Sequence, residues 1–348
     1  MTKRVIVTGA TGLLGSHLLW ELLQRGHSVV AVGRNAARLD SVRRLFAFYG
    51  DADGRQFDSL GWACADVLDY DSLLAAFAGA DEVYHTAAQV SLSRGGRAMW
   101  RCNVDGTRNV VQAVAEAGVG ALCHVSSIAA VGSSADGRPA DEDTPWQPSA
   151  GRSVYSQSKF ASEMIVWQHI HAGLNAVIVN PGVIVGPAYS SQGSGAIART
   201  AGVPFYVDGS ATVVDVRDVA ACMCRLMDAR AYGRRFVVGG HNCTVRDVQT
   251  AFARAYGRRE PGIRIGRPAL MAAATVLDAL AAVSGLRFAL TRQSVRSVTS
   301  RTVYSSQRVT EATGIAFRTL AEAAQNCRSY VDFCAGAQQS AAANRLFV

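Results

Sequence analysis

A tyrosine and a lysine four residues apart have the types and spacing for proton-transfer chemistry. The sequence holds only two lysines, Lys3 and Lys159, and Lys159 follows Tyr155 by four positions. Residues four apart share one face of a helix, so the ammonium can lie beside the phenol. A nearby cation favours the ionised form of a phenol, whose ordinary pKa is about 10. We therefore interpret Tyr155 as a proton donor to a carbonyl oxygen; a core tyrosine beside a surface lysine is the alternative.

Two serines, Ser126 and Ser127, end an apolar run that predicts a strand near 120–126. A serine hydroxyl at this place can hydrogen-bond the carbonyl oxygen that receives the proton. On the pattern alone both serines are candidates. The predicted catalytic set is therefore one of these serines together with Tyr155 and Lys159.

Three glycines mark a turn between the first predicted strand, near 3–8, and the first predicted helix. They are Gly9, Gly12 and Gly15. Gly9 permits a tight turn, Gly12 lets the backbone approach a pyrophosphate, and Gly15 lets the helix pack on the strand. The N-terminus of that helix offers free N–H groups and partial positive charge. The segment predicts a dinucleotide site, against the alternative of a purely structural turn.

The residue at the end of the second predicted strand bears on the choice of cofactor. Chains of this architecture that bind NAD place an acidic residue here for the ribose hydroxyls. This chain has Arg34, and its first acid after that strand is Asp40, inside the next predicted helix. A guanidinium can instead bind a 2′-phosphate. NADP(H) is therefore favoured and NAD(H) is the alternative; an exposed arginine at a strand end is the plain structural interpretation.

Short apolar runs alternate with helical patterns through the first half of the chain. Runs rich in Val, Ile, Leu and Ala are typical of parallel strands covered on both faces. The predicted fold class is α/β, a doubly wound parallel sheet or Rossmann fold, with a nucleotide site at the carboxyl ends of its strands. The predicted strands lie near 3–8, 28–33, 60–65, 81–87, 120–126 and 174–180, and the predicted helices near 12–25, 35–48, 69–78, 97–117 and 153–171.

The pattern changes after residue 187, which predicts a second unit. We expect residues 1–186 to form the dinucleotide-binding Rossmann domain, and 213–240 to rejoin it through a strand at 235–238. Residues 187–212 and 241–334 are expected to form a smaller, mostly helical C-terminal substrate domain. The stretch 335–348, rich in Ala, Gln and Ser, predicts a frayed tail.

Composition and charge argue against several classes of function. The 348 residues carry a net charge of +8, but the arginines are scattered and form no block, so no nucleic-acid partner is expected. The eight cysteines lie at irregular intervals, which predicts neither a metal site nor a disulfide framework. His85 and His124 are interpreted as core histidines of apolar strands.

The two apolar segments that bear on location are the N-terminus and the run 268–283. The chain enters an apolar strand at once, without room for a signal peptide, so a cytoplasmic location is expected. The run 268–283 is too short to span a bilayer and predicts a buried or surface-lying helix.

A series of short motifs in a fixed order carries a resemblance to a known family. The motifs are Thr8–Gly15, Asp66–Val67, His85–Ala88, Asn103–Thr107, Val125–Ser127, Tyr155–Lys159, Asn180–Val183 and Val214–Ala220. On these motifs, from Val5 to about Val331, the chain resembles an extended short-chain dehydrogenase/reductase of the NAD-dependent epimerase/dehydratase family. Its C-terminal half resembles the branch of dihydroflavonol reductases and 3β-hydroxysteroid dehydrogenases.

The resemblance implies a site residue by residue. It implies Ser127 rather than Ser126 as the partner of Tyr155 and Lys159, both of which would also touch the cofactor. Asp66 and Val67 would meet the adenine, although Asp66 could instead cap the helix near 69. The further implied cofactor contacts are Gly9, Thr11, Gly12, Leu13, Leu14, Gly15, Arg34, Ala87, Ala88, Pro181 and Val183. The two alanines could equally be packing at a strand end.

The sequence therefore favours an NADP(H)-dependent oxidoreductase that reduces a largely apolar ketone or aldehyde to an alcohol. An apolar helix at 269–283 is the sign of an apolar pocket, although core burial would explain the same residues. The alternatives are a nucleotide-sugar epimerase or dehydratase with tightly bound NAD(P), and a non-catalytic NADP-binding redox sensor. The epimerase or dehydratase would need cations, which Arg217, Arg258, Arg259 and Arg292 could supply. The expected partner is a small-molecule carbonyl or alcohol substrate, without a membrane span, and a homodimer is left open.

Overall fold

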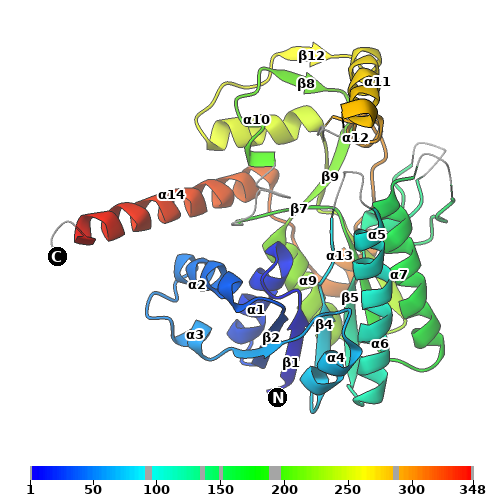
Figure 1. Ribbon diagram of the computed structural model, residues 1–348, viewed down its shortest axis with the longest axis vertical. Coiled ribbons are helices and arrows are strands. Elements are labelled where there is room, and N and C mark those ends of the chain that lie inside the picture. Colours follow the sequence, from blue (N-terminus) through cyan, green and yellow to red (C-terminus); the bar gives the residue numbers. More distant parts are fainter. Residues whose placement is uncertain are drawn as a thin grey trace.

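The computed structural model describes residues 2–90, 96–133, 138–148, 152–187, 197–284 and 290–345 (Figure 1). A seven-stranded sheet forms its lower half, in the order β10-β6-β5-β4-β1-β2-β3, and every pairing in it is parallel. The strands are β1 (Arg4–Thr8), β2 (Ser28–Gly33), β3 (Gly61–Cys64), β4 (Glu82–His85), β5 (Ala121–Val125), β6 (Ala176–Pro181) and β10 (Arg234–Val238). The predicted fold class and the predicted return of 235–238 to the sheet are both confirmed.

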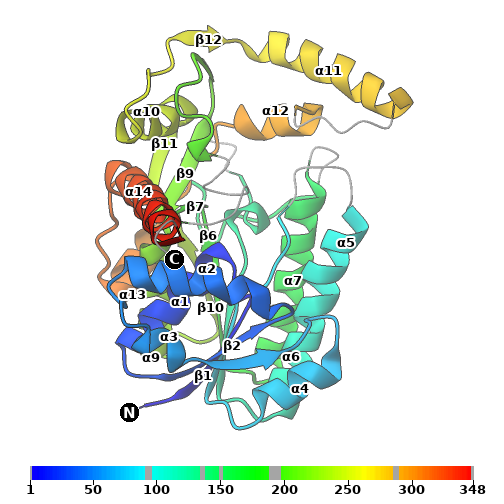
Figure 2. The same cartoon turned by 60° about the vertical axis from the view of Figure 1, so that its left-hand side comes forward.

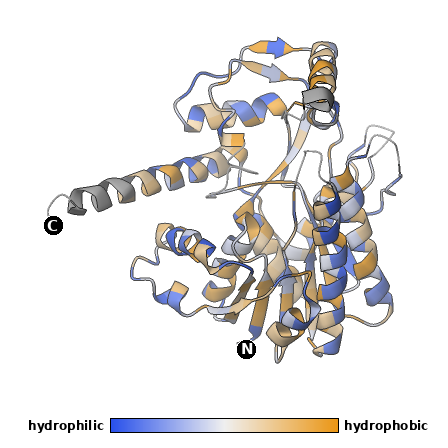
Figure 3. Cartoon of the chain, in the orientation of Figure 1, coloured by the Kyte–Doolittle hydropathy of each residue, from blue (hydrophilic) through white to orange (hydrophobic). Residues whose placement is uncertain are grey.

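Helices cover both faces of this sheet, which explains why its strands carry apolar side chains on both faces. Val5 and Val7 of β1 face one hydrophobic cluster and Ile6 faces the other, and all three side chains are fully buried. The first cluster is closed by α1 (Leu13–Gln24), α2 (Leu39–Phe48) and α9 (Val216–Asp228). The second is closed by α4 (Tyr70–Phe77), α6 (Gly106–Glu116) and α7 (Val154–His171). Figure 3 shows the hydrophobic colours gathered on the strands between these helices.

The predicted helix near 97–117 is observed as three consecutive helical segments without a break between them. It begins as α5 (Gly96–Trp100), widens into a π-helical turn, η2 (Arg101–Asp105), and continues as α6. A π-helical turn inside an α-helix rotates the side chains after it and is frequently found at functional sites. Three further short helices, η1 (Ala36–Arg38), α3 (Arg55–Asp58) and η3 (Ile128–Ala130), were not predicted from the sequence as separate elements.

The upper half of the molecule is built from two small sheets and several helices (Figures 1 and 2). One sheet has the order β11-β9-β7 and the other pairs β12 with β8. The strands are β7 (Val183–Val185), β8 (Phe205–Val207), β9 (Ser210–Asp215), β11 (His241–Thr244) and β12 (Ile263–Ile265). The helices are α10 (Val245–Ala255), α11 (Arg267–Ser284), α12 (Arg292–Val298) and α14 (Leu320–Arg345), whereas α13 (Gln307–Thr313) packs against α9 and β10 of the lower half.

The two apolar or low-complexity C-terminal segments are both helical. The segment 268–283 lies in α11, and no helix in the described ranges is long and apolar enough to cross a bilayer. The backbone of α14 stays helical to Arg345, beyond the point at 335 where the sequence predicted fraying. In Figure 1, α14 extends away from the rest of the chain.

Candidate active site

The sequence-predicted site residues gather along one edge of the central sheet. They follow the carboxyl ends of parallel strands, with the glycine turn after β1, Arg34 after β2, Asp66 after β3, Ala87 after β4 and Ser127 after β5. The strand order reverses direction between β1 and β4, and ligands of open α/β sheets bind in the crevice beyond that point. In Figure 1 this edge faces β7 and β9, which belong to the small sheet β11-β9-β7.

The glycine turn fits a dinucleotide because side chains are excluded from it. Gly9 has a φ of +69°, and a Cβ there would lie 2.6 Å from the backbone nitrogen of Ala87. A Cβ on Gly15 would lie 2.3 Å from the carbonyl oxygen of Gly9. The N-cap of α1 is Gly12, which supplies no side-chain cap, so the N–H groups of the first turn remain for an anion such as a pyrophosphate. The turn therefore places the backbone of Gly9, after β1, directly against that of Ala87, after β4. We call the turn Gly9–Gly15 the glycine cradle.

The other cofactor contacts that the resemblance implies differ in how far their side chains are exposed. The side chain of Leu14 is buried in the core, so only its backbone can reach a cofactor. Thr11 and Leu13 are half-buried and Ala88 is exposed at the same edge. Pro181 is buried at the end of β6, and Val183 is 42% exposed at the start of β7.

Arg34 and Asp66 meet at the ends of neighbouring strands. A guanidinium nitrogen of Arg34 lies 3.6 Å from a carboxylate oxygen of Asp66, and the two side chains are 64% and 36% exposed. Asp66 also accepts a hydrogen bond from the backbone nitrogen of Leu68 at 3.0 Å, whereas Asp69 is the residue that caps α4. The alternative role of Asp66 as a helix cap is therefore wrong. Both side chains stay accessible to a ligand.

Tyr155 and Ser127 are brought together by the start of α7 and the end of β5. Ser153 caps α7 by accepting a hydrogen bond from the backbone nitrogen of Ser156 at 3.0 Å, which fixes the first turn of the helix. Burial raises the pKa of Tyr155, and a hydrogen bond with Ser127 opposes that shift. The phenol is therefore protonated at neutral pH and its hydroxyl contacts the predicted serine.

Lys159 lies one turn further along α7 and points back to β5. Its side chain is almost fully buried, and Nζ donates a hydrogen bond to the carbonyl oxygen of Val125 at 2.8 Å. Burial lowers the pKa of Lys159 to about 8, while the charge of Glu163 opposes the shift. The sequence predicted that this ammonium would lower the pKa of Tyr155. That direction is wrong in this structure, because burial of the phenol dominates and the ammonium is bound to a backbone carbonyl.

Glu163 is a functional candidate that sequence reasoning missed. Its fully buried carboxylate accepts hydrogen bonds from Ser126 Oγ at 2.6 Å and Asn180 Nδ2 at 2.8 Å, and it pairs with Arg235 at 2.9 Å. Asn180 Nδ2 also donates to the carbonyl oxygen of Ser127 at 3.1 Å. Ser126 is thus bound to Glu163, and Ser127 is the serine that contacts Tyr155. The available signal was spacing, since Glu163 follows Lys159 by four residues on the same helix.

Asn103 is a second residue whose role was not anticipated. It lies in the π-helical turn η2 and is 1% exposed. Its side-chain amide accepts from the backbone nitrogen of Gln89 at 2.8 Å and donates to the carbonyl oxygen of Gln89 at 3.1 Å and to Ser158 Oγ at 3.0 Å. Asn103 therefore fastens the segment after β4 to the helix that carries Tyr155.

His85 and His124 lie side by side in β4 and β5, with ring centroids 5.3 Å apart. The ring nitrogens of His85 contact Thr8 Oγ1 at 2.8 Å and Thr107 Oγ1 at 3.2 Å, whereas both nitrogens of His124 are buried without a hydrogen-bond partner. Burial lowers the pKa of both, that of His85 to about 3. Both are neutral core residues, and no cluster of metal-binding side chains exists within the described ranges.

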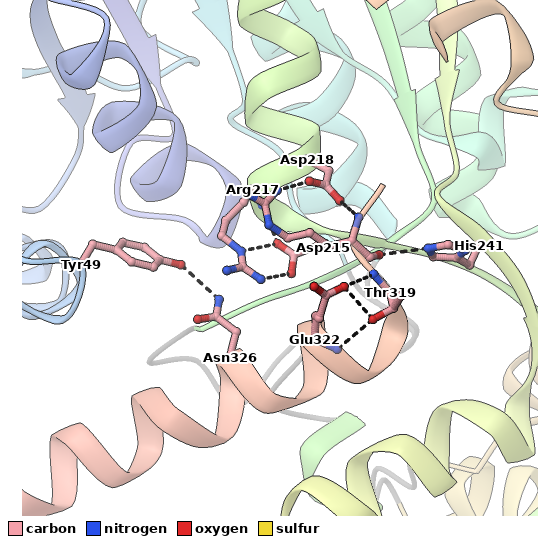
Figure 4. Close-up of polar contacts among 9 residues, drawn as sticks. Tyr49, Asp215, Arg217, Asp218, His241, Thr319, Glu322 and Asn326 are labelled. Carbon is pink, nitrogen blue, oxygen red and sulfur yellow. Dashed lines mark hydrogen bonds and ion pairs between the residues drawn. The ribbon is translucent and has the colours of Figure 1, made fainter. Parts of the chain in front are cut away.

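Arg217 belongs to a cluster of polar side chains above the sheet edge (Figure 4). Its guanidinium binds the fully buried carboxylate of Asp215 through two bonds of 2.9 and 2.7 Å. Asp218 accepts from the backbone nitrogen of Arg318 at 2.7 Å, and Asn326 of α14 donates to the hydroxyl of Tyr49 at 3.3 Å. The cluster joins α9 to the start of α14. Arg292, a second arginine considered as a phosphate ligand, pairs with Asp278 at 3.1 Å.

The sheet order, the glycine cradle and the Ser127–Tyr155–Lys159 set define a dinucleotide-binding enzyme of the doubly wound α/β class. The model of the NAD dependent epimerase/dehydratase family matches residues 5–239. The chain belongs to this family, which consists of extended short-chain dehydrogenases/reductases and binds nicotinamide cofactors. Its general chemistry is NAD(P)-dependent oxidoreduction.

Individual relatives agree with this assignment. The chain is 33% identical over 282 residues to sterol demethylase protein B of Methylococcus capsulatus, covering 79% of this chain and 81% of that protein. It is 32% identical over 248 residues to cinnamoyl-CoA reductase 1 of Oryza sativa, covering 68% and 71%. The crystal structure of gox2253 superimposes with a TM-score of 0.77 at 28% identity, covering 94% of this chain and 98% of the other. Both reductases and epimerases occur among the further matches.

Proposed function

We propose that the protein reduces a largely apolar ketone or aldehyde to an alcohol with NADPH, and that Tyr155 donates the proton. The observation that carries the proposal is the contact of Tyr155 with Ser127 at the carboxyl edge of the sheet, beside a buried Lys159. These three residues and the glycine cradle belong to the same edge, where the reacting groups of substrate and cofactor would meet.

The chemistry assigns one task to each side chain. The glycine turn would hold a reduced nicotinamide cofactor, which would supply the hydride for the carbonyl carbon. Tyr155 gives its phenolic proton to the carbonyl oxygen, and Ser127 hydrogen-bonds that oxygen as negative charge develops on it. The phenolate that remains takes a proton from solvent. Lys159 is charged below its pKa of about 8 and favours the phenolate during this step, although it is bound to Val125 in the free enzyme.

Two exposed apolar side chains, one adjacent to Tyr155 in sequence and one just after β6, support an apolar substrate. Val154, which precedes Tyr155, is 40% exposed, and Val183 is 42% exposed. Apolar side chains are the usual lining of small-molecule sites. The relative named for sterol demethylation agrees with a substrate of this kind.

Replacement of Tyr155 tests the proposed proton donor. In Tyr155→Phe we expect NADPH oxidation with a panel of apolar ketones and aldehydes to fall by about two to four orders of magnitude. Binding of NADPH, followed by its fluorescence, should be retained, because the glycine cradle is unchanged. Tyr232→Phe is the matched control, since Tyr232 precedes β10 at the opposite end of the strands. A fully active Tyr155→Phe enzyme would contradict the proposal.

Arg34 is proposed as the residue that selects NADPH over NADH, through the 2′-phosphate. Its guanidinium is exposed and its only carboxylate partner in the described ranges, Asp66, lies at 3.6 Å, so a phosphate can compete for it. In Arg34→Asp we expect the KM for NADPH to rise roughly tenfold to a hundredfold while the KM for NADH changes little. Arg55→Asp, at an 88% exposed arginine on α3, is the control. An equal rise for both cofactors would refute the assignment.

The alternative functions predict different assays. A nucleotide-sugar epimerase or dehydratase would retain its cofactor through purification and would show no net consumption of NADPH. Arg217 and Arg292 are already paired with carboxylates, which weakens this alternative because fewer cations remain for a second pyrophosphate. A redox sensor would bind NADPH in a fixed ratio without turnover of any substrate.

A further inference from the structure

The exposed side of α11 is apolar, which is unusual for a surface helix. Leu270, Met271, Ala274 and Leu277 face inward or are half-buried. The outward residues are Ala269, Ala272, Ala273, Thr275, Val276, Ala279 and Leu280, all of them exposed, and the hydroxyl of Thr275 donates to the carbonyl oxygen of Met271 at 2.8 Å. Val276 is 59% and Leu280 is 51% exposed. A helix on the surface of a globular protein normally turns polar residues outward, so an apolar outer face indicates a contact outside the fold.

Two further apolar side chains extend this surface onto the neighbouring strands. Phe205 of β8 and Ile263 of β12 are register partners and are 46% and 61% exposed. Figures 1 and 2 place β8, β12 and α11 together at the end of the molecule opposite the N-terminus, with no described segment beyond α11. Figure 3 shows the hydrophobic colouring of α11 there. We call this surface, formed by α11 with β8 and β12, the apical face.

Positive charge is concentrated in the same part of the chain. Although no continuous run of arginines exists, residues 241–301 hold ten arginines against three acidic residues. This stretch therefore accounts for seven of the eight net positive charges of the protein. Two of the three acidic residues in this stretch form ion pairs, Glu260 with Arg254 at 2.8 Å and Asp278 with Arg292 at 3.1 Å.

Several of these arginines are exposed and have no carboxylate partner in the described part of the chain. They are Arg258, Arg259, Arg267, Arg296 and Arg301. An exposed apolar helix flanked by arginines has the composition of a segment that lies in the headgroup region of a membrane. Anionic lipid headgroups would neutralise the arginines while the acyl boundary covers the apolar side chains.

We propose that the apical face docks the protein onto an anionic lipid surface, with the outer side of α11 in the interface. A second copy of the chain is a poorer occupant, because a two-fold contact through this face would bring two strongly positive surfaces together. The proposal does not depend on the reaction that the enzyme catalyses. It requires only peripheral contact, in keeping with the absence of a spanning helix in the described ranges.

Flotation with lipid vesicles tests the proposal on the full chain. We expect the protein to float with vesicles in which one third of the phosphatidylcholine is replaced by phosphatidylglycerol, at least about tenfold more than with pure phosphatidylcholine. Binding should weaken when salt is raised from about 0.1 M to 1 M, because the screening length falls from about 10 Å to about 3 Å. Equal binding to both vesicles, or none to either, would overturn the proposal.

Matched variants distinguish binding through the apical face from non-specific adsorption to vesicles. Val276→Asp should reduce flotation by about tenfold or more, and Val331→Asp, at a 47% exposed valine of α14, should not. Arg258→Gln with Arg259→Gln should reduce it by about fivefold for each arginine, whereas Arg4→Gln with Arg55→Gln at the opposite end should leave it unchanged. Unchanged thermal unfolding of each variant excludes misfolding as the cause.

Two results would identify another occupant and refute the lipid surface. Self-association in sedimentation that Val276→Asp abolishes, without any vesicle binding, would assign the face to a second copy. Binding of a nucleic acid that Val276→Asp leaves intact, again without vesicle binding, would assign the arginines to that partner.

Discussion

Lys159 is the residue whose ionisation lies closest to neutral pH in the candidate site. Burial lowers its pKa to about 8, and the nearby carboxylate of Glu163 keeps it from falling further. The pKa of Tyr155 moves in the opposite direction, above its ordinary value of about 10. A loss of activity near pH 8 would therefore report the lysine rather than the tyrosine.

We expect kcat/KM for carbonyl reduction to fall as the pH rises through about 8, because Lys159 then loses the charge that favours the phenolate. In Glu163→Gln the midpoint of this fall should move to lower pH, since the carboxylate that raises the pKa of Lys159 is gone. A pH profile of kcat/KM from about pH 6 to 10 measures both. Glu116→Gln on the outer side of α6 is the control, and an unmoved midpoint in Glu163→Gln would contradict the coupling.

At the scale of elements, the strands of the central sheet could be predicted because their environment is uniform. A parallel strand buried on both faces reads as an uninterrupted apolar run, and each predicted strand lies within a few residues of the observed one. The carboxyl ends of such strands share an edge, so a nucleotide site there could be predicted. The pairing of β1 with β4, which brings Ala87 against the glycine turn, was not predicted.

Very short elements could not be predicted from the periodicity of apolar residues. The strands β7, β8 and β12 have three residues each, which is too few for an alternation to appear. The π-helical turn at 101–105 has a helical sequence, and only its tertiary contact through Asn103 distinguishes it. The segment of α11 was predicted as a buried or surface-lying helix, and the choice stayed open because the exposure of its outer side depends on which neighbours it meets.

In the candidate site too, residues with a characteristic spacing could be predicted, whereas contacts with distant segments could not. Tyr155 and Lys159 lie four residues apart and the glycines Gly9, Gly12 and Gly15 lie three residues apart, so their spacing was sufficient to find them. The direction of the pKa shift of Tyr155 depends on burial by distant segments, which the local spacing of residues does not reveal. Glu163 was missed for the same reason, because its partner Arg235 is 72 residues away.

At the scale of the whole molecule, Arg235 connects three segments that lie far apart in the chain. It belongs to the edge strand β10, pairs with Glu163 of α7 at 2.9 Å, and donates through Nε to the carbonyl oxygen of Glu142 at 2.8 Å. The side chain of Glu142 in turn accepts from the backbone nitrogen of Val237 at 2.7 Å. The pair couples the last strand of the sheet to the helix that carries Tyr155, and it lies deep, with exposed fractions of 15% and 0%.

Removal of Arg235 should therefore destabilise the whole fold. In Arg235→Ala we expect the free energy of unfolding to fall by about 3–5 kcal/mol, because the carboxylate of Glu163 is left buried without its counter-ion. Urea denaturation measures this change. Arg234→Ala should cost less than about 1 kcal/mol, since the side chain of that neighbour is exposed and its guanidinium carbon lies 5.1 Å from the ring centroid of Phe236. Adding Glu163→Gln to Arg235→Ala removes the unpaired charge while keeping an amide for Ser126, so part of the lost stability should return. A double variant less stable than Arg235→Ala would show that the charge of Glu163 is balanced elsewhere and that this pair does not hold β10 to α7.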